Sequence, residues 1–237
     1  MDSFYSMVKF FVAGGAFMYP ILVVFAVGIA IAIERYFTLT MIRRKNESMW
    51  SRLQPALSNG EFEKAREMTS KDDSTVSRLL SMGLARQGAV RRREDIEIAM
   101  EESMMEIIPQ LEKRTAYVAL GANIATLLGL LGTIIGLIQA FTAVANANPA
   151  EKADLLSASI SVAMNTTAFG LMVAIPLLLF HAKLTSTTGQ IVDSLEMASV
   201  KALNSMSNFN RRHFELKSES SGGKQQVSIQ PQLGTAP

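Results

Sequence analysis

The chain has 237 residues, of which 49% are hydrophobic and 19% charged, and its formal net charge is +2. A charge so close to zero gives no indication of nucleic-acid binding, and the absence of cysteine excludes disulfides and thiolate metal sites. Three segments, residues 10–33, 116–145 and 158–182, contain almost no charged side chains. Each is long enough to cross a hydrocarbon core of about 30 Å, which requires roughly 20 helical residues.

These segments predict an all-α integral membrane protein with three transmembrane helices, in preference to a large soluble helical core. The first segment has neither the basic stretch nor the cleavage site of a removable signal peptide, so we expect a permanent anchor. Gly14-Gly15 and Pro20 predict a bend where it begins.

The basic residues predict how the chain is oriented. Of the 23 Lys and Arg, 15 lie in residues 34–115 and six follow the third span. Lys and Arg accumulate on the cytoplasmic side of a membrane, whereas acidic residues have little influence. The predicted organisation is an outer N-terminus with the first transmembrane helix (1–34), a cytoplasmic helical domain (35–115), the second transmembrane helix (116–146), a periplasmic loop (147–157), the third transmembrane helix (158–182), a cytoplasmic helical extension (183–217) and a disordered tail (218–237).

The segment after the first span is helical in pattern. Asn59-Gly60 predicts a break between two short helices, and Asp72-Asp73-Ser74 predicts the start of a helix over 75–87. A strongly amphipathic pattern then leads into the second span with only Pro109 to interrupt it. We therefore expect one helix from about 92 to 146, bent near Pro109, which extends the second transmembrane helix far into the cytoplasm. The extension over 183–217 does the same for the third transmembrane helix.

The basic triplet Arg91-Arg92-Arg93 has two interpretations. It could contact lipid headgroups or the tail of a partner protein. The acidic residues that follow it favour the alternative of a solvated, charge-balanced face.

Small residues recur at four-residue spacing in the second span. Such stripes allow two transmembrane helices to approach closely. Close packing favours their association in lipid, where the hydrophobic effect does not drive helices together. Two adjacent stripes suggest neighbours on both sides, as in a ring of subunits, and ordinary packing within one chain is the alternative. The stripes comprise Gly121, Ala125 and Gly129, and then Gly132, Gly136 and Ala140, while Gly170 lies on a similar stripe of the third span.

Polar side chains interrupt the third span at Asn165-Thr166-Thr167, although residues 161–180 contain no Asp, Glu, Lys or Arg. A single threonine in a membrane helix commonly bonds to a carbonyl one turn earlier, which is the simplest interpretation here. The Asn165 amide requires several partners and is harder to explain in this way.

The second span carries matching polar residues. Thr126 and Thr133 share a face, with Asn123 on its edge. We expect Thr133 and Thr167 at similar depth, within about one helical turn, if their helices are antiparallel neighbours. These residues together predict an uncharged polar patch in the membrane.

No ionisable residue accompanies this patch, and a threonine does not carry a net proton at neutral pH. We therefore expect the titrating group to come from another protein. His181 and His213 have no partner at metal-ligand spacing, and no nucleophile–base pair or phosphate loop is present, so neither a cofactor nor an enzymatic activity is expected.

Two stretches, LLGTIIG (130–136) and NTTAFG (165–170), resemble the signature of the MotA/TolQ/ExbB proton channel family. The three-span layout with a large loop after the first span is similar to the ExbB/TolQ branch. The resemblance implies a pentamer in the bacterial inner membrane around single-span ExbD- or TolR-like subunits, each with an aspartate in its span. It also implies that proton entry drives motion that passes to a TonB- or TolA-like protein, with Thr133 and Thr167 at the family's pore-threonine positions.

One departure concerns a glutamate that ExbB and TolQ proteins carry five residues before the second pore threonine. This chain has Val162 there, so no proton role for that glutamate is transferred, and the coupling ion, H⁺ or Na⁺, stays open. The main hypothesis is a non-enzymatic motor subunit that energises TonB-dependent import or Tol-type envelope maintenance. A flagellar- or gliding-type stator and a passive membrane scaffold are the alternatives.

Overall fold

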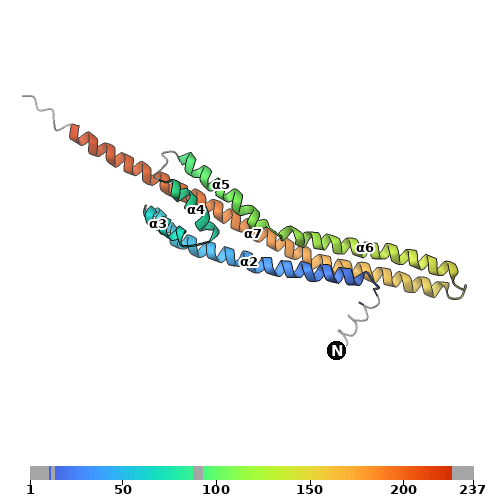
Figure 1. Cartoon of the computed structure of the whole chain (residues 1–237). Coiled ribbons are helices and arrows are strands. Elements are labelled where there is room, and N and C mark those ends of the chain that lie inside the picture. The colour runs from blue at the N-terminus through green and yellow to red at the C-terminus, as the bar shows by residue number, and fades with distance from the viewer. Residues whose placement is uncertain (1–10, 12–13, 88–92, 226–237) are drawn as a thin grey trace, which may run out of the picture. The chain divides into compact units, whose positions relative to one another are not determined.

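The computed structural model describes residue 11, residues 14–87 and residues 93–225, with side chains up to residue 209. The outermost N-terminal residues, Arg91 and Arg92 of the basic triplet, and the tail from 226 lie outside this description. Figure 1 shows the labelled helices, and no β-strand occurs in the part of the chain that is described.

Three helical stretches among the described residues are long and apolar enough to cross a membrane: Met18–Ser58, Arg93–Asn146 and Lys152–Phe209. The prediction of a three-span, all-α membrane protein is confirmed. The chain divides into two compact units, of which the first comprises Met1–Met41 with Pro109–Gln190, and the second Ile42–Ile108 with Ile191–Pro237.

Helix α2 (Met18–Ser58) begins just after a turn in which Gly15 has a φ of 77°. Pro20 lies in its first turn, where the missing N–H has no helical partner to lose. Within the first unit its buried side follows helical spacing through Ile21, Ala32 and Leu39. The opposite side exposes large apolar side chains, as a surface in contact with lipid requires.

The expectation of one helix from about 92 to 146, bent near Pro109, is wrong in its detail. Helix α5 (Arg93–Glu112) continues through Pro109, and a separate helix α6 (Thr115–Asn146) follows. The break falls at Lys113-Arg114, where Arg114 has a left-handed φ of 68°. A proline removes one helical N–H, whereas a left-handed residue ends the helix itself.

Helix α7 (Lys152–Gln225) is 74 residues long and contains Pro176. It includes residues 152–157, which were expected in the loop, and residues 218–225, which were expected in a disordered tail. The connection between α6 and α7 is therefore only 147–151.

The second unit contains two short helices, α3 (Phe62–Ser70) and α4 (Thr75–Arg86). Gly60 has a φ of 77°, so the predicted break at Asn59-Gly60 is confirmed. Ser74 is the N-cap of α4 and accepts a hydrogen bond from the Ser77 amide at 3.2 Å, which confirms the predicted start signal.

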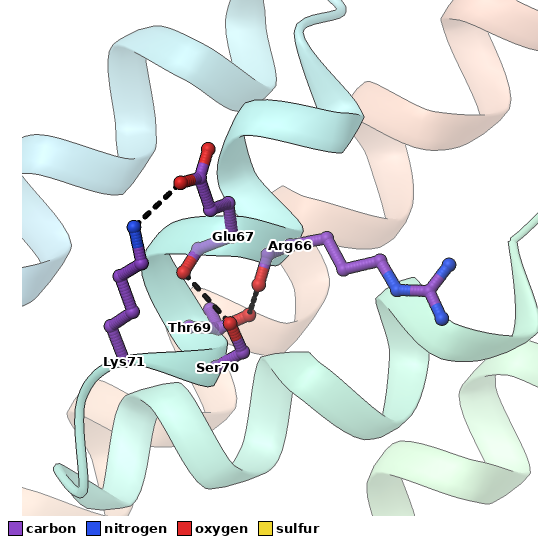
Figure 2. Close-up of polar contacts among 5 residues, drawn as sticks. All are labelled: Arg66, Glu67, Thr69, Ser70 and Lys71. Carbon is purple, nitrogen blue, oxygen red and sulfur yellow. Dashed lines mark hydrogen bonds and ion pairs between the residues drawn. The ribbon is translucent and has the colours of Figure 1, made fainter.

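The end of α3 is stabilised by local contacts, which Figure 2 shows. The hydroxyls of Thr69 and Ser70 donate to the carbonyls of Arg66 and Glu67, at 3.0 and 2.9 Å. Lys71 forms an exposed ion pair with Glu67 at 2.6 Å. Such side-chain bonds compete with helix propagation, which fits their position at a helix end.

Candidate functional site

The second and third membrane-spanning helices, α6 and α7, approach each other at glycines within the first unit. A Cβ atom built on Gly129 would lie 3.3 Å from the Cα atoms of both Thr167 and Gly170. One built on Gly170 would lie only 2.7 Å from the Ala125 carbonyl oxygen. Backbone atoms on both sides fill this space, so the contact admits no side chain.

The second small-residue stripe of α6 also meets α7 of the same chain. A Cβ atom on Gly132 would lie 2.4 Å from Thr166 Cγ2, and one on Gly136 would lie 2.9 Å from the Ala163 Cβ. Gly121 is in looser contact, with Leu177 and Val24 side chains at 3.8 Å. Packing within one chain therefore accounts for these glycines, and the stripes alone give no argument for a ring.

The contacts also establish the register of the two helices. Residues Gly129 and Gly136 on α6 face Thr167 and Ala163 on α7, so the helices run antiparallel. Thr133 lies one turn beyond Gly129, which Thr167 contacts, and the structure thus places Thr133 and Thr167 within about one turn of each other.

Thr167 joins the two helices directly. Its hydroxyl donates to the Gly129 carbonyl across the interface at 2.8 Å. The half-buried Thr133 donates instead to the Leu130 carbonyl in its own helix, at 2.6 Å. Both hydroxyl protons are occupied, so each oxygen offers only lone pairs to a further group.

Thr166 has a different surrounding from its neighbour. It is buried, and its hydroxyl lies 2.6 Å from the Gly14 carbonyl and 3.0 Å from the Val162 carbonyl. One proton is thus shared between the turn before α2 and its own helix. Thr166 therefore binds the N-terminal turn.

The remaining polar candidates are more accessible. Thr126 donates to the Ala122 carbonyl at 3.1 Å and lies on an exposed side of α6, as Asn123 does. The half-buried Asn165 makes no hydrogen bond to any residue that the structure describes. Its amide, like that of Asn123, therefore has donors and an acceptor still available among the described residues.

The turn before α2 is a part of the site that sequence patterns did not reveal. The ring of Phe11 meets Phe169 edge-on at a centroid distance of 5.7 Å, and Gly15 lies against Val162, the position of the missing glutamate. Gly14-Gly15 signalled a bend, but no local pattern indicates which residue of α7 the bend contacts.

The site has no charge of its own. Residues 115–150 and 155–180 contain no Asp, Glu, Lys or Arg. In the described part of the chain, no three His, Asp or Glu residues come together in a way that could bind a metal ion. The arrangement can accept hydrogen bonds through Thr133 and Thr167 and orient water or a polar group through Asn165, but it cannot itself take up a proton.

The chain is similar to a set of membrane transport proteins. The model of the MotA/TolQ/ExbB proton channel family matches residues 71–197. A putative biopolymer transport protein, ExbB-like 3 from Synechocystis sp., is 30% identical over 172 residues, which are 71% of this chain and 80% of that protein.

Two further relatives extend the comparison. The putative biopolymer transport protein ExbB homolog of Methanothermobacter thermautotrophicus is 28% identical over 207 residues, covering 83% of this chain and 69% of the relative. The Tol-Pal system protein TolQ of Haemophilus influenzae is 34% identical over 86 residues, 36% of this chain and 37% of the relative.

Proposed function

Since this chain belongs to the MotA/TolQ/ExbB proton channel family, we propose that it is an ExbB/TolQ-like subunit of a motor driven by the proton-motive force. The motor would energise TonB-dependent import across the outer membrane, or Tol-type envelope maintenance. An ExbD/TolR-like protein with a single span would be its direct partner, and a TonB/TolA-like protein would receive the force.

The observation that supports this proposal best is a polar patch with no ionisable group. Thr133 and Thr167 lie within about one turn of each other on α6 and α7, Asn165 lies on another side of α7, and the stretches around them contain no acidic or basic residue. A channel that moves protons needs a group that binds and releases them. The carboxyl group of the partner's span would supply it.

The state of the two hydroxyls suggests what they do for that carboxyl group. Because both donate to backbone carbonyls, their oxygens accept a hydrogen bond from a protonated carboxyl group or from water. They would stabilise the neutral acid as it crosses the apolar part of the membrane. An ionised carboxylate would instead find its donors in water.

The proposed arrangement follows the distribution of basic residues. The N-terminus and the loop within 147–157 would face the periplasm, and the parts rich in Lys and Arg, together with the C-terminus, would face the cytoplasm. The protein would lie in the bacterial inner membrane as a pentamer, with the patches of its copies around the partner's spans.

Replacement of Thr133 or Thr167 by valine tests the proposal. Valine keeps the shape of the side chain and removes the hydroxyl, so proton flux through vesicles that contain both subunits should fall by about tenfold or more. Thr142→Val is the matched control, since its hydroxyl also bonds back along α6, to Ile138 at 2.9 Å, but lies outside the patch. Equal flux in all three variants would refute the assignment of the site.

A second arm of the same experiment addresses the source of the titrating group. Vesicles that contain this protein alone should show no steady, selective proton flux, and addition of the partner should create it. Full conductance from the protein alone would refute the proposed role of the partner's carboxyl group.

A further inference from the structure

The carbonyl oxygen of Leu111 has two possible hydrogen-bond donors. In an unbroken helix it would accept from the amide of Thr115, four residues later. The structure instead records a hydrogen bond from the Arg35 guanidinium to this carbonyl. Within the described residues, no backbone bond runs from Thr115 N–H to Leu111. Arg35, and not the Thr115 amide, is thus the donor that this carbonyl has in the structure, although its two lone pairs have room for both.

Arg35 is unusually placed for a charged residue. It lies on the buried side of α2 between Ala32 and Leu39 and is only 5% exposed. Its Nε atom has no hydrogen-bond partner among the described residues. Burial of a guanidinium costs free energy unless the group is hydrogen-bonded or paired, and the hydrogen bond to the Leu111 carbonyl offsets part of this cost.

Glu34, the neighbour of Arg35 on α2, contacts Arg114 within the break between α5 and α6. Glu34 forms an ion pair with Arg114 at 3.6 Å, and Arg114 is the residue with the left-handed backbone, at φ 68° and ψ −13°. This conformation is unfavourable for a residue with a Cβ atom. Two adjacent residues of α2 therefore hold both the freed carbonyl and the strained residue.

The hydrogen-bonding groups of Thr115 fit a break that residues of α2 hold open. The Thr115 side chain is 6% exposed, and its hydroxyl has no hydrogen-bond partner among the described residues. As the first residue of α6, its amide has no helical acceptor either. The joint thus contains unused donors that a continuous helix would satisfy in part.

We propose that Arg35 is a positioning residue that selects between two forms of the α5–α6 joint. With Arg35 on the Leu111 carbonyl, the helices are separate and α6 starts at Thr115. When Arg35 leaves, the Thr115 amide takes that carbonyl, Arg114 returns to the right-handed conformation, and one helix forms. The change alters the direction and rotation of α6, the helix that carries Thr133.

Amide hydrogen exchange at Thr115 tests this directly and does not depend on ion transport. Arg35→Met keeps an unbranched apolar stem and removes the donor. The exchange rate of the Thr115 amide should then fall by about tenfold or more, because this amide becomes hydrogen-bonded to the Leu111 carbonyl. Unchanged exchange at Thr115 in a folded Arg35→Met protein would overturn the proposal.

A second pair of variants keeps the test decisive if Arg35→Met does not fold. Arg114→Gly relieves the left-handed strain and should hold the break open, with Thr115 exchange as fast as in the parent protein. Arg114→Ala loses the ion pair to Glu34 but keeps the strain, so exchange should slow about fivefold. Identical exchange in the glycine and alanine variants would contradict the two-form joint.

The double variant distinguishes two roles for Arg35: selection between two forms of the joint, and simple stabilisation of the fold. If Arg35 acts by opposing helix closure, Arg35→Met with Arg114→Gly should recover fast exchange at Thr115 and the proton flux of the parent. If Arg35 merely stabilises the fold, the glycine would give no recovery, and that result would also overturn the proposal.

Discussion

Thr167 donates its hydroxyl proton to the carbonyl of Gly129, 2.8 Å away on the neighbouring helix. The bond is possible because Gly129 and Gly170 let the two backbones meet without intervening side chains. The same close approach that packs α6 on α7 thus also orients one of the two threonines of the proposed passage.

Gly170 should be intolerant of even the smallest side chain. In Gly170→Ala the new methyl group would meet the backbone carbonyl of Ala125, so the helices must separate, and we expect a loss of about 1–3 kcal/mol. Thermal unfolding in detergent measures it. Gly189→Ala is the control on the same helix, because nothing lies within 4 Å of its Cβ position, and it should stabilise by up to about 1 kcal/mol. Equal effects in both variants would contradict the described contact.

The bond from Thr166 should hold the turn before α2 in place. Thr166→Val removes the side-chain donor that the described residues offer to the Gly14 carbonyl and should destabilise the protein by about 1–2 kcal/mol. Amide exchange in the first turn of α2 should accelerate as the turn loosens. Thr166→Ser retains the hydroxyl and should behave like the parent. A serine variant as weak as the valine variant would show that the methyl group, and not the hydrogen bond, matters.

Thr188 should be replaceable by valine with a gain in stability. Its side chain is 5% exposed, and its hydroxyl has no hydrogen-bond partner among the described residues. Removal of a buried, unpaired hydroxyl at constant shape should gain about 1 kcal/mol, seen as a higher unfolding temperature. Thr187→Val is the control, since that hydroxyl donates to the Lys183 carbonyl at 2.9 Å, and it should give no gain.

Asp72 should make the start of α4 sensitive to acid. Hydrogen bonding by Ser74 is the main cause that lowers the pKa of Asp72 below its ordinary value, against the opposing effect of burial, and Ser77 and Lys45 contribute further. A lowered folded-state pKa means that the carboxylate contributes stability above the unfolded-state pKa of about 3.9 and loses it as pH falls through the folded value. The stability difference between the parent and Asp72→Asn should therefore shrink below about pH 4. A difference that stays constant down to pH 2.5 would contradict this role.

The membrane spans and the helix break and helix start of the second unit were predictable from the sequence. Uncharged runs of this length have few alternatives, and the break at Asn59-Gly60 and the cap at Ser74 depend on backbone preferences of the residues themselves. The small-residue stripes likewise indicated close helix packing, but not whether the neighbouring helix belongs to the same chain.

The position of the second break was not predictable in the same way. Pro109 was the visible helix breaker, yet α5 ends at Glu112, and the break contains Arg114, which has no intrinsic preference for its left-handed conformation. Glu34, which pairs with Arg114, and Arg35, which donates to the Leu111 carbonyl, both lie on a helix far away in the sequence. Arg35 is 76 residues from the carbonyl that it contacts.

The sequence alone determined that this protein has three membrane-spanning helices and carries uncharged polar side chains within them, because hydropathy and side-chain chemistry are properties of the residues themselves. Tertiary structure decided which hydroxyls of the patch remain accessible: Thr166 is held by the Gly14 carbonyl 152 residues away, while Thr167 crosses to Gly129. It also decided where α6 begins. Hydrogen bonds between distant segments depend on which helix faces meet, and that follows from the packing of the whole bundle.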